Sequence, residues 1–127
     1  MKIRMFVNGQ AMSGGSLYGP LSGQKRLDIN ATAPRYRFYA VRREFPGLYP
    51  VVTGGVAIAG ETYELDDAVL RDEILPAEPE ELELTMIELA DGSGSLCMQL
   101  RKEWLGRDGV EDISQWGSWH RFMASLR

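Results

Sequence analysis

The sequence contains one cysteine, Cys97, and one histidine, His120, and these shortages limit its chemistry. A single cysteine forms no intrachain disulfide, so we expect a reducing cytoplasm as the compartment. One Cys and one His are too few for a structural zinc site, so no metal is expected. Any Ser-His-Asp or Cys-His catalyst would need His120, and no Gly-x-Ser-x-Gly segment presents a serine nucleophile. Cys97 is expected to be a small buried apolar residue rather than a reactive thiol.

Long apolar runs and an excess of positive charge are also missing. No run approaches the roughly 20 residues that cross a bilayer, and the short apolar segment 5–7 is too small for a signal-peptide core. A membrane role is therefore not expected. The net charge of −4 argues against a nucleic-acid partner, because phosphate neutralisation needs a basic surface. One basic cluster has two readings, a solvated strand face with its loop or a surface that attracts anions; it consists of Arg35, Arg37, Arg42 and Arg43.

The glycine-rich segment 6–19 (FVNGQAMSGGSLYG) lacks the lysine of a phosphate-binding P-loop. Gly9 and Gly14 have the P-loop spacing, but Gly15 stands where the lysine belongs. The dinucleotide-binding glycine pattern is absent too, because Gly92-Ser93-Gly94 falls in an expected hairpin. No cofactor is therefore expected.

What is present fits an ordinary globular protein. The chain has 127 residues, of which 44% are hydrophobic and 25% charged, so we expect one domain over residues 1–127 with its own core. Alternating apolar residues predict a half-buried strand over 2–7, and a second strand follows over 36–41. The segment 13–25 is expected to be a long loop or one short helix.

The middle of the chain predicts loops, strands and one short helix. Segment 45–50, with two prolines, is expected to be an ordered loop, and 56–65 a strand. Asp66 and Asp67 supply an N-cap for a helix that ends at Pro76. The apolar phase switches within 82–89, which predicts a strand with a bulge or with burial on both faces. Asp91-Gly92 predicts a hairpin to a further strand through Leu100.

The final segment predicts a helix that opens at Asp112 and Gln115. Apolar residues at three- and four-residue intervals, from Ile113 to Leu126, would face the core. Gly117 inside this helix is expected to allow close packing. The element order predicts an α+β fold, a mainly antiparallel sheet curled into a small barrel with short helices at its rim.

Carboxylate and backbone-amide chemistry remains as the candidate function. Of the glutamates at 61, 64, 73, 78, 80, 81 and 83, Glu78 is singled out because Pro76 and Pro79 bracket it and fix its backbone direction. If its side chain pointed into the mouth of the sheet, desolvation would raise its pKa into the range of general acid–base work. Backbone N–H groups of Gly9, Gln10 and Ala11 could hold a carboxylate or oxyanion there. The competing reading is a structural turn and a surface Glu78.

Several motifs resemble a known family. Residues 6–10 (FVNGQ), 36–39, 45–48 (FPGL) and 56–65, with its Gly60-Glu61-x-Tyr63-Glu64-Leu65, resemble the γ-glutamylcyclotransferase-like (AIG2-like) superfamily. Three further motifs resemble the allophanate hydrolase C-terminal domain as a separate chain without its amidase half: residues 32–36 (TAPRY), 88–92 (ELADG) and 112–119, with its Asp-Ile-Ser and Gly-x-Trp.

The resemblance implies a site. In the cyclotransferases a Tyr-Gly-Ser/Thr-Leu turn after the first strand lines the pocket, and it corresponds to residues 8–11 here, with only Gly9 kept. The expected substrate-binding residues are Asn8, Gly9, Gln10, Ala11 and Met12. The family's general acid or base, a glutamate after the short helix, corresponds to Glu78. The allophanate hydrolase domains often have an apolar residue there and resemble catalysts for loss of carbon dioxide from N-carboxycarbamate.

These implications give two hypotheses. The first is a small-molecule enzyme acting on a small carboxylated amide or amine in urea or allophanate metabolism, with Glu78 as general acid or base. The second is a non-catalytic ligand-binding or assembly subunit that partners a separate amidase. Such docking would use Trp104, Trp116 or the loop at Phe45 if these are exposed, whereas core packing is the alternative for the aromatic residues.

Overall fold

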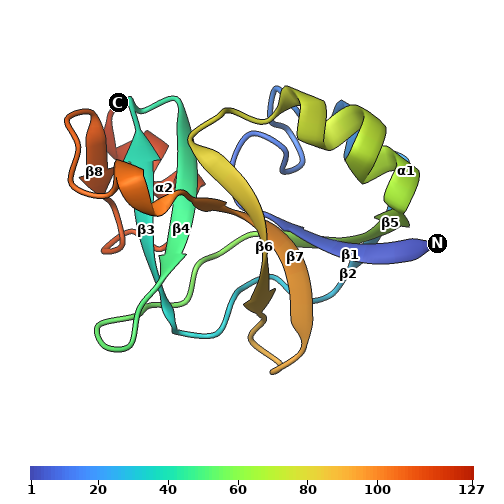
Figure 1. The fold of residues 1–127 in the computed structure, drawn as a ribbon, viewed down its shortest axis with the longest axis horizontal. Helices are drawn as coiled ribbons and strands as arrows, with labels where there is room; N and C mark the ends of the chain where they lie inside the picture. The colour runs from blue at the N-terminus through green and yellow to red at the C-terminus, as the bar shows by residue number, and fades with distance from the viewer.

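The computed structural model describes residues 1–127 and contains one sheet with short helices beside it (Figure 1). The two termini lie at opposite ends of the longest axis. Eight strands make up the sheet: β1 (Lys2–Val7), β2 (Lys25–Leu27), β3 (Tyr36–Val41), β4 (Phe45–Pro50), β5 (Glu61–Asp66), β6 (Leu82–Glu88), β7 (Gly94–Leu100) and β8 (Val110–Asp112).

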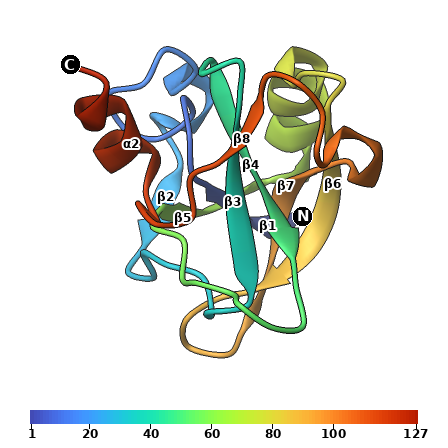
Figure 2. The same ribbon diagram turned by 90° about the vertical axis from the view of Figure 1, so that its left-hand side faces the viewer.

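The strand order is β2-β5-β1-β7-β4-β3-β8, and β6 pairs with the remaining edge of β7. Five of the pairings are antiparallel, and β7 runs parallel to both β1 and β4. The α+β fold with a mainly antiparallel sheet is therefore confirmed. Closure into a barrel is wrong, because the end strands β2 and β8 do not pair with each other, and β7 joins two groups of strands across the molecule (Figures 1 and 2).

The predicted short helix is present between β5 and β6. It runs from α1 (Asp67–Val69) through a π-helical turn η2 (Leu70–Ile74) to a 3₁₀ turn η3 (Leu75–Ala77). Asp66 occupies the N-cap position, but its side chain makes no capping hydrogen bond and pairs with Lys2 at 3.3 Å instead. None of the helices in the protein has the length and apolar character required to cross a membrane.

Part of the sheet is buried on both faces. Met5, Phe6 and Val7 are all buried, so the second half of β1 is covered on both sides and the expectation of a half-buried strand is wrong there. The predicted β6–β7 hairpin pairs without interruption from Leu82 to Glu88, so it contains no bulge. The switch of apolar phase along β6 instead reflects burial on both faces, which was the alternative prediction. Leu82 and Ile87 are buried on opposite faces of this strand.

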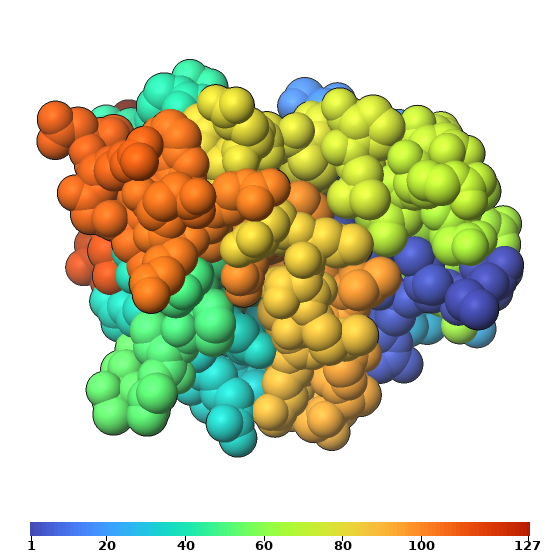
Figure 3. All heavy atoms as spheres, in the orientation of Figure 1, coloured from blue at the N-terminus to red at the C-terminus, as the bar shows by residue number.

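The hairpin also exposes apolar side chains. Leu84 is 39% and Met86 is 65% exposed on β6, whose outer edge has no strand partner. Figure 3 shows this hairpin, yellow to orange, at the molecular surface.

Residues 45–50 form strand β4 rather than the predicted loop. They pair along their length with β3, whereas only Leu48 pairs with β7 on the other edge. Proline lacks an N–H donor, and this sparsely paired edge tolerates it. The strand expected over 56–65 begins only at Glu61, because Val56 and Ala59 make isolated bridges to other segments.

The terminal helix is shorter than predicted. Residues 110–112 form β8, Gly117 adopts a left-handed conformation with φ of 61°, and α2 (Trp119–Ser125) begins only after Ser118. Ser118 is the true N-cap, since its side chain accepts a hydrogen bond from the Arg121 N–H at 3.3 Å. Asp112 instead ends β8 and accepts a hydrogen bond from the Ser114 N–H at 2.9 Å, so the predicted helix start at Asp112 is wrong. The remaining short elements are the 3₁₀ turns η1 (Gly19–Leu21) and η4 (Lys102–Trp104).

Candidate functional site

The turn after β1 presents free backbone donors. Met12 closes the turn by donating its N–H to the Gly9 carbonyl at 3.1 Å, and Leu17 donates to the Gln10 carbonyl at 2.9 Å. Among the hydrogen bonds outside the helices and strands, none uses the N–H of Gly9, Gln10 or Ala11 as donor. A buried donor without a partner is rare, so this turn is suited to hold a ligand oxygen or water.

Close packing explains two of the glycines in this segment. A Cβ at Gly9 would lie 2.6 Å from Cδ of Pro46 on β4, and a Cβ at Gly15 would collide with the carbonyl of Gln10. Gly14, with φ of 83°, supplies a left-handed turn between them. The glycines therefore serve a tight turn against β4, and not a P-loop.

A small cavity of about 50 Å³ lies beside this turn. Asn8, Gly9 and Ala11 line it together with Glu78, and Cys97 from β7 adds a thiol. Most of the remaining wall is apolar and comes from β1, β4, the start of β6 and β7. We call this space the inner cavity.

Glu78 lies at the end of η3, where its backbone turns to an extended conformation with φ of −78° and ψ of 142°. Its N–H donates to the Leu75 carbonyl at 3.1 Å, and the residue is half-buried. No hydrogen bond or ion pair engages its carboxylate within the protein, and burial raises its pKa to about 7. Of the bracketing prolines, Pro76 lies within η3, and the Pro79 carbonyl accepts from the Leu82 N–H at the start of β6.

Two of the five residues expected to bind substrate do not line the inner cavity. Met12 is only 4% exposed and belongs to the main core cluster, so its side chain packs rather than binds. Gln10 is half-buried, and its carbonyl holds Leu17. Ala11, which stands between them in the chain, does line the inner cavity, so only part of this turn faces it.

Sequence reasoning missed the position of Cys97 opposite Glu78. The thiol is buried, as expected, and burial together with the nearby Glu78 charge raises its pKa. Asn8 is 8% exposed, and its amide has one polar contact, to the Cys97 sulfur at 4.0 Å. The register of β1 beside β7 brings the two residues together, and no local sequence signal reports that register.

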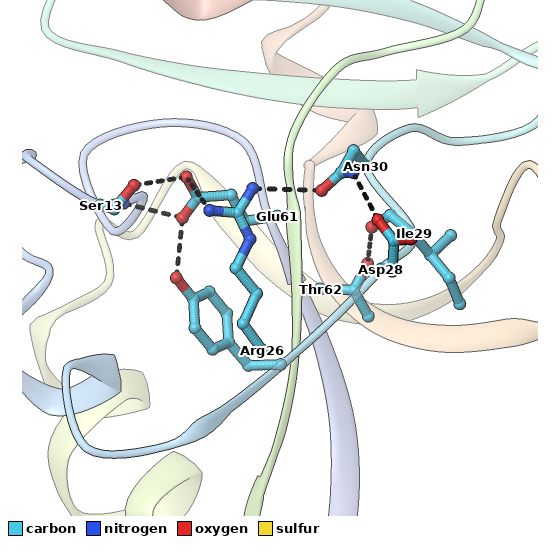
Figure 4. Close-up of polar contacts among 8 residues, drawn as sticks. Ser13, Arg26, Asp28, Ile29, Asn30, Glu61 and Thr62 are labelled. Atoms are coloured by element: carbon cyan, nitrogen blue, oxygen red, sulfur yellow. Dashed lines mark hydrogen bonds and ion pairs between the residues drawn. The ribbon is translucent and has the colours of Figure 1, made fainter.

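A second carboxylate, that of Glu61 on β5, is fully partnered (Figure 4). It accepts hydrogen bonds from the Ser13 N–H at 2.8 Å, the Ser13 hydroxyl at 2.7 Å and the Tyr63 hydroxyl at 2.8 Å, and pairs with Arg26 at 3.4 Å. Burial alone would raise the pKa of Glu61, but these donors outweigh it and lower the pKa. This glutamate fixes the glycine-rich loop onto β5 and β2.

Other candidate groups lie outside the inner cavity. Each arginine of the basic cluster pairs with a carboxylate: Arg35 with Glu88, Arg37 with Asp112, Arg42 with Glu81 and Glu44, and Arg43 with Glu111. The cluster is therefore a set of ion pairs rather than a free anion-binding surface. His120 is exposed on α2 and does not line the inner cavity, and no group of three metal-ligating side chains occurs in the structure.

Several solved structures share this fold. A protein specific to uropathogenic E. coli is 28% identical over all of this chain and 99% of its own length, with a TM-score of 0.87. The Kluyveromyces lactis allophanate hydrolase is 22% identical with a TM-score of 0.90. The match covers 100% of this chain and 22% of that protein. An AIG2-like protein from Mus musculus is 21% identical over 88% of both chains, with a TM-score of 0.57. The protein thus has the α+β fold of the AIG2-like class.

The sequence identifies the family within that class. Residues 3–124 match the family model of the allophanate hydrolase C-terminal domain, and the chain therefore belongs to that family. The K. lactis urea amidolyase contains a region of the same fold, which is 23% identical, has a TM-score of 0.89 and makes up 8% of that chain. A comparison with curated protein sequences found no match.

Proposed function

We propose that this chain is a small-molecule enzyme that acts on a small carboxylated amide or amine, with Glu78 as its general acid or base. One observation carries the proposal. The inner cavity combines an unpartnered glutamate, whose pKa is about 7, with a turn whose backbone N–H groups are free. A proton donor that titrates near neutral pH is suited to acid–base catalysis.

The charges around the cavity favour Glu78 as the acid in the first step. No Lys, Arg or His lines the inner cavity, so an anionic group would be held by the N–H groups of Gly9 and Ala11. An ionised Glu78 would repel that anion, whereas a protonated Glu78 would not. Binding of a carboxylated substrate therefore favours the form of Glu78 that can donate a proton.

The family supports a link to urea and allophanate chemistry. In decarboxylation of N-carboxycarbamate, the bond from nitrogen to one carboxyl carbon breaks, carbon dioxide leaves, and the nitrogen takes up a proton. Glu78 would supply that proton and regain one from solvent. The single buried thiol, Cys97, suits a reducing cytoplasm as the compartment for this reaction.

The test compares Glu78→Gln with Glu80→Gln, a matched change at an exposed glutamate two residues away. Wild type is assayed for 5-oxoproline release from γ-glutamyl amines and for carbon dioxide release from N-carboxycarbamate formed in situ by a separate allophanate amidase. We expect Glu78→Gln to lower the rate with its substrate by about 100-fold or more, in the range of general acid–base catalysis, and Glu80→Gln to leave it unchanged. Equal rates for wild type and Glu78→Gln would exclude this role.

A second candidate, an assembly subunit for a separate amidase, is favoured by exposed Leu84 and Met86 on the free edge of β6. The aromatic residues expected to dock are instead half-buried: Trp116 packs against the main core, whereas Trp104 and Phe45 pack against a smaller cluster. Co-purification with an amidase that is lost in a Leu84→Lys, Met86→Lys variant, without turnover by the isolated chain, would favour this function over catalysis.

A further inference from the structure

A second cavity adjoins the inner one. Its volume is about 170 Å³, and Ala11 and Glu78 line both spaces. Its other walls come from the glycine-rich loop, η1 and the helical segment η2–η3. We call it the outer cavity. A ligand held beside Glu78 can therefore extend past Ala11 and Glu78 into a larger space.

The two cavities differ in size and in polar groups. The inner cavity, at about 50 Å³, exceeds the roughly 10–15 Å³ that one water needs on the same measure and suits a small planar group such as a carboxyl or carbamoyl group. Asn8 lines it with an amide that is more than nine-tenths buried and has only a weak sulfur contact. No hydrogen bond within the protein involves the Asn8 amide oxygen, so this side chain can offer a polar group to a ligand in the inner cavity.

The outer cavity offers apolar surface and one free carboxylate. Leu17 and Ile74 contribute apolar wall, and Leu17 is 46% exposed although it borders a cavity. Glu73 lines the same space, is exposed and makes no ion pair in the structure. No Lys, Arg or His borders either cavity, so an extended ligand meets carboxylates as the only charged side chains.

We propose that the outer cavity binds the second arm of the ligand, an alkyl chain that ends in an ammonium group, and that Glu73 selects its positive charge. The inference rests on the proposed function, because the carboxylated end must occupy the inner cavity. Methylene groups of the arm would cover Leu17 and Ile74, and the ammonium would lie near Glu73. The substrate class thus narrows to small carboxylated compounds with a distal amine.

Two probes of matched shape test this. Both 5-aminopentanoate and hexanoate have a carboxylate and four methylenes, and they differ only in a terminal ammonium or methyl group. Each is titrated into the full chain while backbone amide NMR signals of residues 9–11, 17, 73–75, 77 and 78 are followed. We expect both probes to shift residues 9–11, and 5-aminopentanoate to bind about two- to five-fold more tightly, which is the range for an exposed ion pair.

The variant Glu73→Gln keeps the shape and removes the charge. We expect it to abolish the preference for 5-aminopentanoate and to leave hexanoate binding unchanged. Leu17→Ser should weaken both probes equally, because it removes apolar wall but no charge. Wild type with no preference, or a preference that survives in Glu73→Gln, would overturn the role of Glu73. If neither probe shifts residues 9–11, the proposed function itself fails at the inner cavity.

Discussion

Two glutamates lie beside the glycine-rich loop and differ in the partners and in the pKa of their carboxyl groups. Ser13 of that loop binds Glu61 through both its N–H and its hydroxyl, whereas Ala11 borders the two cavities beside Glu78. Four donor groups satisfy Glu61, and none in the protein satisfies the side chain of Glu78. The pKa of Glu61 is lowered, and that of Glu78 is raised to about 7.

The difference shows which carboxylate is structural and which is available for chemistry. A buried carboxylate whose lone pairs are all occupied is held ionised and fixes its neighbours. A half-buried carboxylate without partners can exchange a proton near neutral pH and accept a ligand's hydrogen bond. Burial alone does not separate the two roles, because burial raises the pKa in both cases.

Removal of Glu61 is expected to have the largest effect on folding. Glu61→Ala leaves the Ser13 and Tyr63 donors and the Arg26 charge without their acceptor, so we expect about 3 kcal/mol less stability in urea unfolding. The control is Glu64→Ala on the same strand, where the side chain is half-buried and makes no ion pair. It should change stability by less than about 0.5 kcal/mol. Similar losses in the two variants would contradict a special role for Glu61.

The stability difference between wild type and Glu78→Gln should depend on pH. The folded-state pKa of Glu78, about 7, lies above its ordinary value of 4.5, so the folded protein binds the proton more tightly than the unfolded chain. Its contribution is therefore fully present below about pH 4.5 and is lost as pH rises through about 7, by up to about 3 kcal/mol. Glutamine does not titrate, so urea unfolding of both proteins from pH 4 to 8 isolates the pH-dependent contribution of Glu78 to stability. A constant difference across that window would argue against the raised pKa.

A side chain at Gly9 should disturb the turn without touching either glutamate. In Gly9→Ala the new methyl group would lie 2.6 Å from Pro46 Cδ, so β1 and β4 must separate at the inner cavity. We expect a loss of about 2 kcal/mol, as for other overpacked positions, measured by thermal or urea unfolding. Gly23→Ala is the matched control, because a methyl group there would have no neighbouring atom within 4 Å. An unchanged stability for Gly9→Ala would show that Pro46 moves freely.

The smallest effect is expected from one hydroxyl of the Glu61 network. Ser13→Ala removes the hydrogen bond from the Ser13 hydroxyl but keeps its N–H contact, so we expect a loss of about 1.5 kcal/mol. Ser16→Ala on the same loop removes a hydroxyl that has no hydrogen bond in the structure and should be neutral. Equal effects at the two serines would mean that loop flexibility, and not the Glu61 contact, sets the result.

The sequence was informative where a local signal is strong. Asp91-Gly92 located the hairpin, and Pro76 and Pro79 drew attention to Glu78, which lines the cavity next to the turn at Gly9. The two prolines of β4 led to the prediction of a loop, but the sparsely paired edge of this strand tolerates them. The apolar spacing around Gly117 predicted a helix interior, but this residue has a left-handed conformation and lies before α2.

The remaining features depend on long-range contacts. Glu61 and Glu78 were both candidates by residue type, and only the partners from distant segments, Ser13 and Arg26, distinguish them. Cys97 reached the inner cavity through the parallel pairing of β7 with β1, which has no signature in local periodicity. A pattern along the chain predicts an element, but not what lies across the sheet from it.

The most direct test of the contrast is a ¹³C NMR titration of the glutamate side-chain carboxyl carbons in the intact protein. We predict a midpoint of about 7 for Glu78 and one below the ordinary 4.5 for Glu61. Such a result would establish a carboxyl that holds its proton up to neutral pH beside free backbone donors. A Glu78 midpoint near 4.5, like that of an exposed glutamate, would contradict the account.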